Sequence, residues 1–562
     1  MRYRTTPRWG RVAGWALVAA VPLAFLTVFF AWPVSALVLR GFVPEGALDL
    51  GGFTEVLARP RTWRIIGLTL AQATLGTLLA VLLGVPGAYV LYYRTFRGQR
   101  LVRALVTVPF VLPTVVVGVA FRSLLAESGP LGFLGLDRTF AAIVAALVFF
   151  NYPLVVRTVG GMWERLDPRT EQAARTLGAG RFRAFWTITL PALTPAIASA
   201  AAVVFLFCAT AFGVVLVLGG IRFGTIETEI WVQTTQFLDL RAAAVLSVLQ
   251  FVVVGGALLV FSRTRARREA ALNLRGVRHQ ARRLQLWRDG RPGADLAVTG
   301  FTALVIGVLL ALPLGSLVLR SLRTSDGWGL DNYLALGTTG GPNALSVTVW
   351  EATANSLRIA VDATVIAVVI GTLVALLISR RPRGRRAQRA VSVLDGLFML
   401  PLGVSAVTVG FGFLITLNRP PVDLRSSLIL IPIAQAVVAI PLVVRTVLPV
   451  LRAIDPRLRE VAGTLGAAPV RVLVHVDGPY LVRSLGLAIG FAFAVSLGEF
   501  GATSFLSRPD RPTLPVVIFR LIGRPGAENY QMALAASVVL AILTAAIMTI
   551  AERLRSEQAG EF

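Results

Sequence analysis

Very few residues in this chain have the types and spacing that catalysis or metal binding needs. The single cysteine, Cys208, excludes an intramolecular disulfide and a thiolate cluster, and the two histidines, His279 and His475, lie in separate basic segments. No Gly-x-x-x-x-Gly-Lys-Ser/Thr loop, which would hold the phosphates of a nucleotide, occurs in the sequence. We therefore expect no enzymatic activity, no metal site and no cofactor in this chain.

One carboxylate, Glu499, occupies a position where a charge is costly. It lies within or near the end of an apolar run, and an ionisable residue at membrane depth is a candidate for a substrate pathway. A structural explanation carries the same weight as a role in a substrate pathway. In it, Glu499 caps the outer end of a helix or pairs with an arginine such as Arg508. Five further pathway candidates lie near Glu499 or on a matching stretch earlier in the chain: Ser496, Thr503, Thr225, Thr513 and Glu227. For Glu227, a solvated loop carboxylate is the favoured alternative.

The elements that would position these residues are membrane-spanning helices. The chain has 562 residues, 56% of them hydrophobic and 15% charged, which is more apolar surface than one soluble core buries. Continuous apolar runs of about 20 residues favour helices over a barrel, because lipid leaves no partner for unpaired backbone. We predict an all-α polytopic membrane protein with about twelve spans, near 12–39, 65–93, 103–121, 139–156, 190–219, 242–262, 296–319, 359–379, 391–417, 427–444, 480–506 and 530–551.

The placement of the arginines predicts the orientation of these spans. The net charge is +26, yet the basic residues form short clusters between apolar runs, which is typical of cytoplasmic loops and argues against nucleic-acid binding. The densest cluster is 263–291, and most acidic residues fall in the opposite loops. The first run is long enough for a span and lacks a clear cleavage site, so we expect it to be retained. We expect both termini in the cytoplasm and contacts with membrane lipids.

The chain contains an internal repeat with a spacing of 288 residues. Pro113 matches Pro401, NYPLVVRTV at 151–159 matches AIPLVVRTV at 439–447, and Thr225 matches Thr513. One spacing at such separated positions predicts two homologous six-span halves. An even number of spans per half makes the repeat parallel, about an axis along the membrane normal. We assign the first repeat to 1–262, an Arg-rich cytoplasmic linker to 263–291 and the second repeat to 292–562.

The same spacing relates two copies of one extramembrane stretch, 167–191 and 455–479. In each copy an Asp can cap a helix start, a Pro fits the first helical position and a Gly suits the helix end. These residues are Asp167, Pro168 and Gly178 in the first copy and Asp455, Pro456 and Gly466 in the second. Each copy predicts a short surface helix, and for one copy alone a connector lying on the bilayer is the simpler interpretation.

Both stretches resemble the cytoplasmic EAA loop of ABC importer permeases. The matching residues are Gln172, Ala173, Ala174 and Gly178 in the first copy and Glu460, Val461, Ala462 and Gly466 in the second. The resemblance implies two coupling helices, each docking into a separate ATP-binding-cassette ATPase subunit that binds ATP and Mg²⁺. The second copy departs from the motif at Val461 and at Asp477-Gly478, and the first at Gln172, which predicts unequal coupling at the two sites.

The resemblance also implies a function. The chain would be the permease subunit of a bacterial inner-membrane importer, which takes its substrate from an extracytoplasmic binding protein and moves it to the cytoplasm by alternating access. The stretch 205–231 resembles thiamine permeases, whereas 496–503 with Thr513-Leu514-Pro515 is shared with thiamine, iron, molybdate and sulfate permeases. We expect thiamine or its phosphates as the substrate, with iron(III) as the alternative.

An ion-coupled secondary transporter is the main alternative class. Twelve spans in two parallel halves suit that class as well. It does not explain the two matched cytoplasmic loops, and few acidic residues lie in the middle of the predicted spans.

Overall fold

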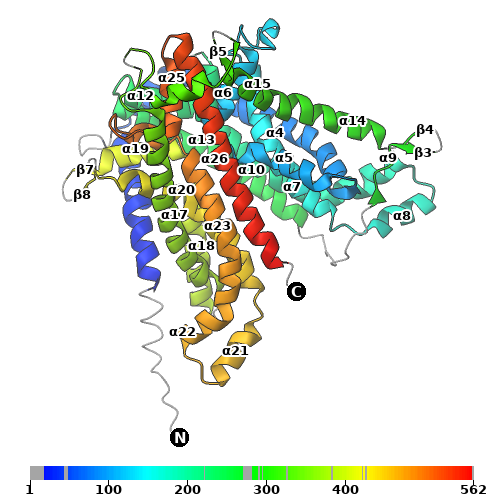
Figure 1. Ribbon diagram of the computed structural model, residues 1–562. Helices are drawn as coiled ribbons and strands as arrows, with labels where there is room; N and C mark the ends of the chain where they lie inside the picture. Colours follow the sequence, from blue (N-terminus) through cyan, green and yellow to red (C-terminus); the bar gives the residue numbers. More distant parts are fainter. Residues whose placement is uncertain are drawn as a thin grey trace, which may run out of the picture. The chain divides into compact units, whose positions relative to one another are not determined.

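The computed structural model describes residues 18–43, 49–220, 222–269, 282–288, 291–293, 295–324, 327–342, 344–380, 384–419, 422–424 and 427–559 (Figure 1). The arginine cluster before residue 12, residues 270–281 of the predicted linker and both chain ends lie outside the described residues. The description that follows therefore concerns the helical body of the chain.

The predicted all-helical membrane fold is confirmed. In the described part of the chain, nine helices are long and apolar enough to cross a membrane, and up to twelve if each of three bent pairs is one span. The strands are two-residue pairs in loops: β1 Arg94–Thr95, β2 Arg282–Arg283, β3 Trp287–Arg288, β4 Arg291–Pro292, β5 Arg323–Thr324, β6 Gly327–Trp328, β7 Asn418–Arg419 and β8 Val422–Asp423. β1 pairs with β2 in parallel, and the other three pairs are antiparallel.

The helices form two compact units, which we call the N-terminal unit (Phe53–Glu229 and Val248–Asn332) and the C-terminal unit (Met1–Gly52, Ile230–Ser247 and Tyr333–Phe562). α3 Gly51–Ala58, α12 Ile226–Thr235, α13 Leu240–Glu269 and α16 Asp331–Leu334 each have residues in both units. The helices wholly within the N-terminal unit are α4 Pro60–Ala88, η2 Tyr89–Tyr93, α5 Gln99–Val111, α6 Thr114–Leu125, η3 Gly132–Leu134, α7 Phe140–Trp163, α8 Pro168–Thr176, α9 Arg181–Ala184, η4 Phe185–Thr189, α10 Leu190–Ala209, α11 Gly213–Gly219, α14 Leu296–Val305, η5 Ile306–Ala311 and α15 Leu312–Ser321.

The C-terminal unit repeats this order of elements. It holds η1 Thr27–Ala31, α2 Trp32–Phe42, η6 Ala335–Gly337, α17 Val349–Ser379, α18 Arg385–Gly403, α19 Ala406–Thr416, α20 Leu430–Ala453, α21 Pro456–Thr464, α22 Pro469–Val472, η7 Leu473–Asp477, α23 Gly478–Gly498, α24 Thr503–Leu506, α25 Leu514–Gly523 and α26 Ala527–Ala559. α8 and α21, like α12 and α25, start 288 residues apart, which agrees with the spacing found in the sequence.

Each unit is built on a layer of packed long helices. In the C-terminal unit, α17 and α23 both pack against α20 (Figure 1). Apolar side chains of these three helices form much of the unit's core. α17 begins at a capping box, in which Thr348 and Glu351 each accept a hydrogen bond from the other's backbone N–H. In the N-terminal unit, α4 and α10 pack against α7 in the equivalent way.

Two predicted spans are each a bent pair of helices instead of one straight helix. The run near 103–121 is the pair α5 and α6, bent by 104°, and the run near 391–417 is the pair α18 and α19, bent by 91°. Pro113 lies at the first break, and Pro401 lies in the last turn of α18. Proline has no N–H to donate to the preceding turn, which favours a break there. The predicted run 190–219 is also divided, because α10 ends at Ala209 and α11 begins at Gly213.

The first span of each half packs with the helices of the other half. α2 lies against α19 in the C-terminal unit, where the rings of Phe29 and Phe413 are 6.4 Å apart. The span 296–321 belongs to the N-terminal unit, where the buried Asp295 accepts hydrogen bonds from Tyr89 (2.7 Å) and Arg94 (2.9 Å). The first span of each predicted repeat therefore belongs to the compact unit that holds most of the other repeat. The boundaries of the repeats themselves stay a prediction.

Candidate functional site

The helix α8 starts and ends as its sequence predicts. The Asp167 carboxylate accepts a hydrogen bond from the Arg169 N–H at 2.9 Å, and Pro168 occupies the first helical position. At the other end, Gly178 has a φ of +89°, its N–H bonds to the Arg175 carbonyl, and the next N–H bonds back to Ala174 at 3.0 Å. This is a Schellman ending, and it requires the left-handed backbone that glycine adopts without strain.

The helix α21 has the same two ends. The Asp455 carboxylate accepts from the Arg457 N–H at 2.9 Å, and Pro456 is the first helical residue. Gly466 has a φ of +82°, and the N–H of Ala467 bonds to the Ala462 carbonyl at 3.0 Å. The two predicted short helices are therefore built by the same local hydrogen bonds.

Neither helix contains a buried residue, and both end on exposed apolar side chains. Leu177 is 88% exposed and Leu465 is 82% exposed, and the following segments expose Phe182 and Val470 to similar extents. Within the motif, Gln172, Ala173, Glu460 and Val461 are exposed, whereas Ala174 and Ala462 are half-buried. The part of the chain that the structure describes leaves these surfaces uncovered.

The two helices are attached to their own units by different contacts. In the N-terminal unit, the Tyr93 hydroxyl donates to Glu171 of α8 at 3.2 Å. In the C-terminal unit, the fully buried carboxylate of Asp477 accepts from Arg459 of α21 at 2.7 Å and from Arg380 at 2.8 Å. The sequence marked Asp477 only as a departure from a motif. Its role as an anchor depends on an arginine 97 residues away, which no local pattern reveals.

Three of the predicted pathway residues are close together in the C-terminal unit. The buried Glu499 accepts from the backbone N–H of Ala502 at 2.7 Å, from that of Thr503 at 3.0 Å and from the Thr503 hydroxyl. Glu499 thus caps the start of α24, whereas Arg508 pairs with Asp510 at 3.1 Å. Ser496 is buried one turn before Glu499.

The sequence did not single out Gln435, which donates from its amide to the Thr503 hydroxyl at 3.3 Å. Within the described residues, the buried oxygens of Ser496, Gln435 and Thr513 have no hydrogen-bond partner. Unsatisfied buried oxygens of this kind need an explanation such as water or a ligand.

The first repeat places Thr225 and Glu227 at the start of α12. Both are fully buried, so the interpretation of Glu227 as a solvated loop carboxylate is wrong. Its carboxylate accepts a hydrogen bond from the side-chain amide of Gln250, on α13, at 2.8 Å. Nearby, Gln72 donates to the Cys208 carbonyl at 2.8 Å. Gln250 and Gln72 were also missed, since a single amide in an apolar run is a weak signal.

Among the residues that the structure describes, no group of three or more His, Cys, Asp or Glu side chains could hold a metal ion. The site therefore consists of two exposed helices and separate clusters of buried polar side chains. This arrangement can bind partners and solutes.

Comparison with known proteins assigns the chain to a family. Residues 76–268 match the model of the binding-protein-dependent transport system inner membrane component. The sulfate transport system permease protein CysT of Escherichia coli K12 is 31% identical over 258 residues, which is 44% of this chain and 91% of CysT. The chain belongs to this family of permeases. It is therefore a noncatalytic, multi-pass inner-membrane subunit of an ABC importer.

Two other relatives match the permease along most of its length. The thiamine transport system permease protein ThiP of Escherichia coli K12 is 28% identical over 503 residues, 88% of this chain and 89% of ThiP. ThiP of Salmonella typhimurium LT2 is 27% identical over 520 residues, 91% of this chain and 92% of that protein. The similarity thus extends over both predicted repeats.

Proposed function

We propose that this permease carries thiamine or its phosphates into the cell. The observation that supports the proposal most is the match to two thiamine permeases over 88% and 91% of the chain, because substrate class follows full-length similarity better than similarity over one repeat. The sulfate permease matches 44% of the chain. The motif 205–231 agrees with thiamine, and no observation of the structure favours iron(III).

Uptake into proteoliposomes tests the substrate. The purified chain is reconstituted with its partner ATPase and binding protein, and uptake of labelled thiamine, thiamine monophosphate, ferric ion and sulfate is compared. We expect ATP-dependent uptake of thiamine or its monophosphate. Uptake of ferric ion or sulfate in their place would contradict the proposed substrate, and uptake driven by an ion gradient without the ATPase would contradict the mechanism.

We also propose that α8 and α21 bind two ATPase subunits on the cytoplasmic side. Two short helices have no buried residue, and none of the described residues covers Leu177 or Leu465. A groove on a partner would bury such apolar side chains. Closure of the ATPase subunits would then move the two helices and alternate access to a binding site in the membrane, which opens on the outer side to the substrate-binding protein.

Charge substitution tests the docking without touching the fold. Leu177→Glu and Leu465→Glu alter exposed side chains, so we expect each variant to fold normally and to bind the ATPase more weakly by at least about tenfold. Phe133→Glu is the matched control, because Phe133 is 80% exposed and lies in a predicted outer loop. Unchanged ATPase binding in both leucine variants would contradict the proposed docking.

A further inference from the structure

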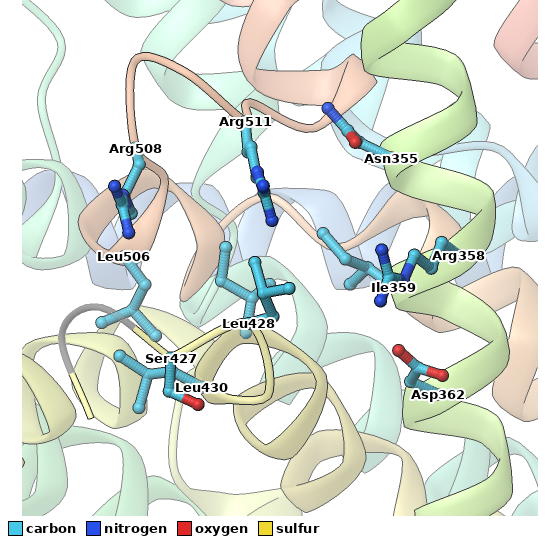
Figure 2. Close-up of a pocket in the computed structure, with 11 residues that line it drawn as sticks. Asn355, Arg358, Ile359, Asp362, Ser427, Leu428, Leu430, Leu506, Arg508 and Arg511 are labelled. Carbon is cyan, nitrogen blue, oxygen red and sulfur yellow. The ribbon is translucent and has the colours of Figure 1, made fainter.

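A pocket in the C-terminal unit gathers three arginines at one end of α17. It has a volume of about 300 Å³. Arg358 reaches it from α17, and Arg508 and Arg511 reach it from the loop after α24 (Figure 2). Leu428 and Leu506 line its apolar side, and Asp362 lies one turn below Arg358 (Figure 2). Such a pocket combines positive charge with an apolar wall.

At least one of these positive charges, that of Arg358, is available to a ligand. Asp510 pairs with Arg508 at 3.1 Å and lies 3.9 Å from Arg511. In the described residues, no ion pair or hydrogen bond joins Arg358 to a partner. Two carboxylates, Asp362 and Asp510, lie near the three arginines. The pocket therefore keeps a net positive charge, which suits a phosphate group.

The length of α17 places this pocket at a membrane surface. The helix has 31 residues, about 46 Å at the usual rise per residue, whereas the hydrocarbon layer is about 30 Å thick. Its other end carries Arg380 at the predicted cytoplasmic surface. Counting about 20 residues from that end leaves Arg358 and Asp362 at the level of the outer headgroups.

An exposed apolar stripe continues from the pocket along the same helix. Val361, Val365 and Val369 are 49%, 58% and 52% exposed, and they follow Arg358 and Asp362 toward the middle of α17. A ligand with a charged head and a long apolar tail fits both surfaces at once.

We propose that this pocket binds the phosphodiester of an anionic membrane phospholipid, whose acyl chain lies along the valine stripe. The first repeat gives an internal comparison. At the positions 288 residues earlier, Arg358, Asp362, Arg508 and Arg511 are replaced by Leu70, Thr74, Gly220 and Phe223. The repeated fold forms without these charges, so the arginines serve something other than the architecture.

Native mass spectrometry of the full chain tests this proposal. The protein is extracted from vesicles containing phosphatidylglycerol and phosphatidylcholine, and the lipids that remain bound are counted. We expect at least one retained phosphatidylglycerol, and about tenfold weaker retention in the double variant Arg358→Gln/Arg511→Gln, because charge-assisted contacts to the phosphate are lost. The single variant Arg511→Gln changes a residue on an exposed loop, so we expect it to fold normally. It should show a smaller loss of phosphatidylglycerol retention than the double variant.

The control is Arg138→Gln/Arg222→Gln, which removes two exposed arginines from predicted outer loops of the first repeat. Equal retention by the pocket variant and the unmodified chain would overturn the proposal, and so would an equal loss in the control. A second arm adds inorganic phosphate or thiamine monophosphate. Displacement of the lipid by either soluble phosphate at low concentration would overturn the lipid as the occupant, whereas retention supports it.

Discussion

Asp477 has no acidic counterpart in the first repeat, where Thr189 stands at the equivalent position. Its carboxylate is fully buried between two arginines, one from α21 and one from the end of α17. A buried carboxylate is stable only while its partners remain. At the scale of single residues, this ion triad is what joins the second candidate coupling helix to its transmembrane helices.

We expect Asp477→Asn to lower the free energy of unfolding by about 3 kcal/mol, since two arginines lose a buried partner. Asp395→Asn is the matched control, because Asp395 and Arg452 form a half-exposed pair at 3.4 Å whose loss costs under about 1 kcal/mol. Reversible unfolding of the purified chain in bicelles measures both. Equal effects of the two substitutions would contradict the anchoring role.

Glu499 gives a second prediction at this scale. Glu499→Ala removes the acceptor for two backbone N–H groups and should destabilise the chain by about 1–2 kcal/mol, as the loss of a helix cap does. Glu499→Gln keeps one oxygen as an acceptor, so we expect it to retain most thiamine uptake. Loss of uptake in Glu499→Gln with normal stability would instead show that the negative charge acts in the substrate pathway.

At the scale of elements, α8 and α21 depend on two glycines with left-handed backbone. Gly178→Val and Gly466→Val force a β-branched residue into a conformation that costs about 1–2 kcal/mol. We expect about tenfold faster amide exchange of Ala179 and Ala467 and weaker stimulation of the ATPase by loaded binding protein.

Gly180→Val provides the comparison for this experiment. Gly180 is exposed, its φ is outside the left-handed region, and an added Cβ would meet no atom within 4 Å. This variant should keep both the protection of Ala179 and normal coupling. A loss of coupling as large as that of Gly178→Val would mean that side-chain bulk, and not backbone conformation, is responsible.

At the scale of the whole molecule, the span 18–42 packs with the helices of the second repeat. A Cβ added at Gly412 would lie 3.1 Å from the Cβ of Pro33, so a small shift of either helix reaches the separation of about 3.5–4.5 Å found in disulfides. We expect the variant Pro33→Cys/Gly412→Cys to form a disulfide on oxidation, detected by mass spectrometry of its peptides. Pro33→Cys/Gly463→Cys should stay reduced, because a Cβ added at Gly463 meets no atom within 4 Å. The opposite pattern would contradict the observed packing.

The sequence alone determined the helical class, the spacing of 288 residues and both ends of α8 and α21. These features follow from continuous apolar runs and from hydrogen bonds between residues a few positions apart, so their causes lie next to one another in the chain. Pro113 and Gly178 are examples, because each acts on its own local backbone.

Only the tertiary structure decided which distant side chains meet. Asp477 and its two arginines, and the residues of the arginine pocket, come from separate parts of the sequence. The same holds for the first span of each half, which packs with helices of the other half, and Glu227 is buried against residues outside its own helix. Each depends on which helix faces pack, and an apolar run of bilayer length does not specify its neighbour. Local hydrogen bonds therefore fixed the elements of this permease, and packing inside the membrane selected the contacts between them.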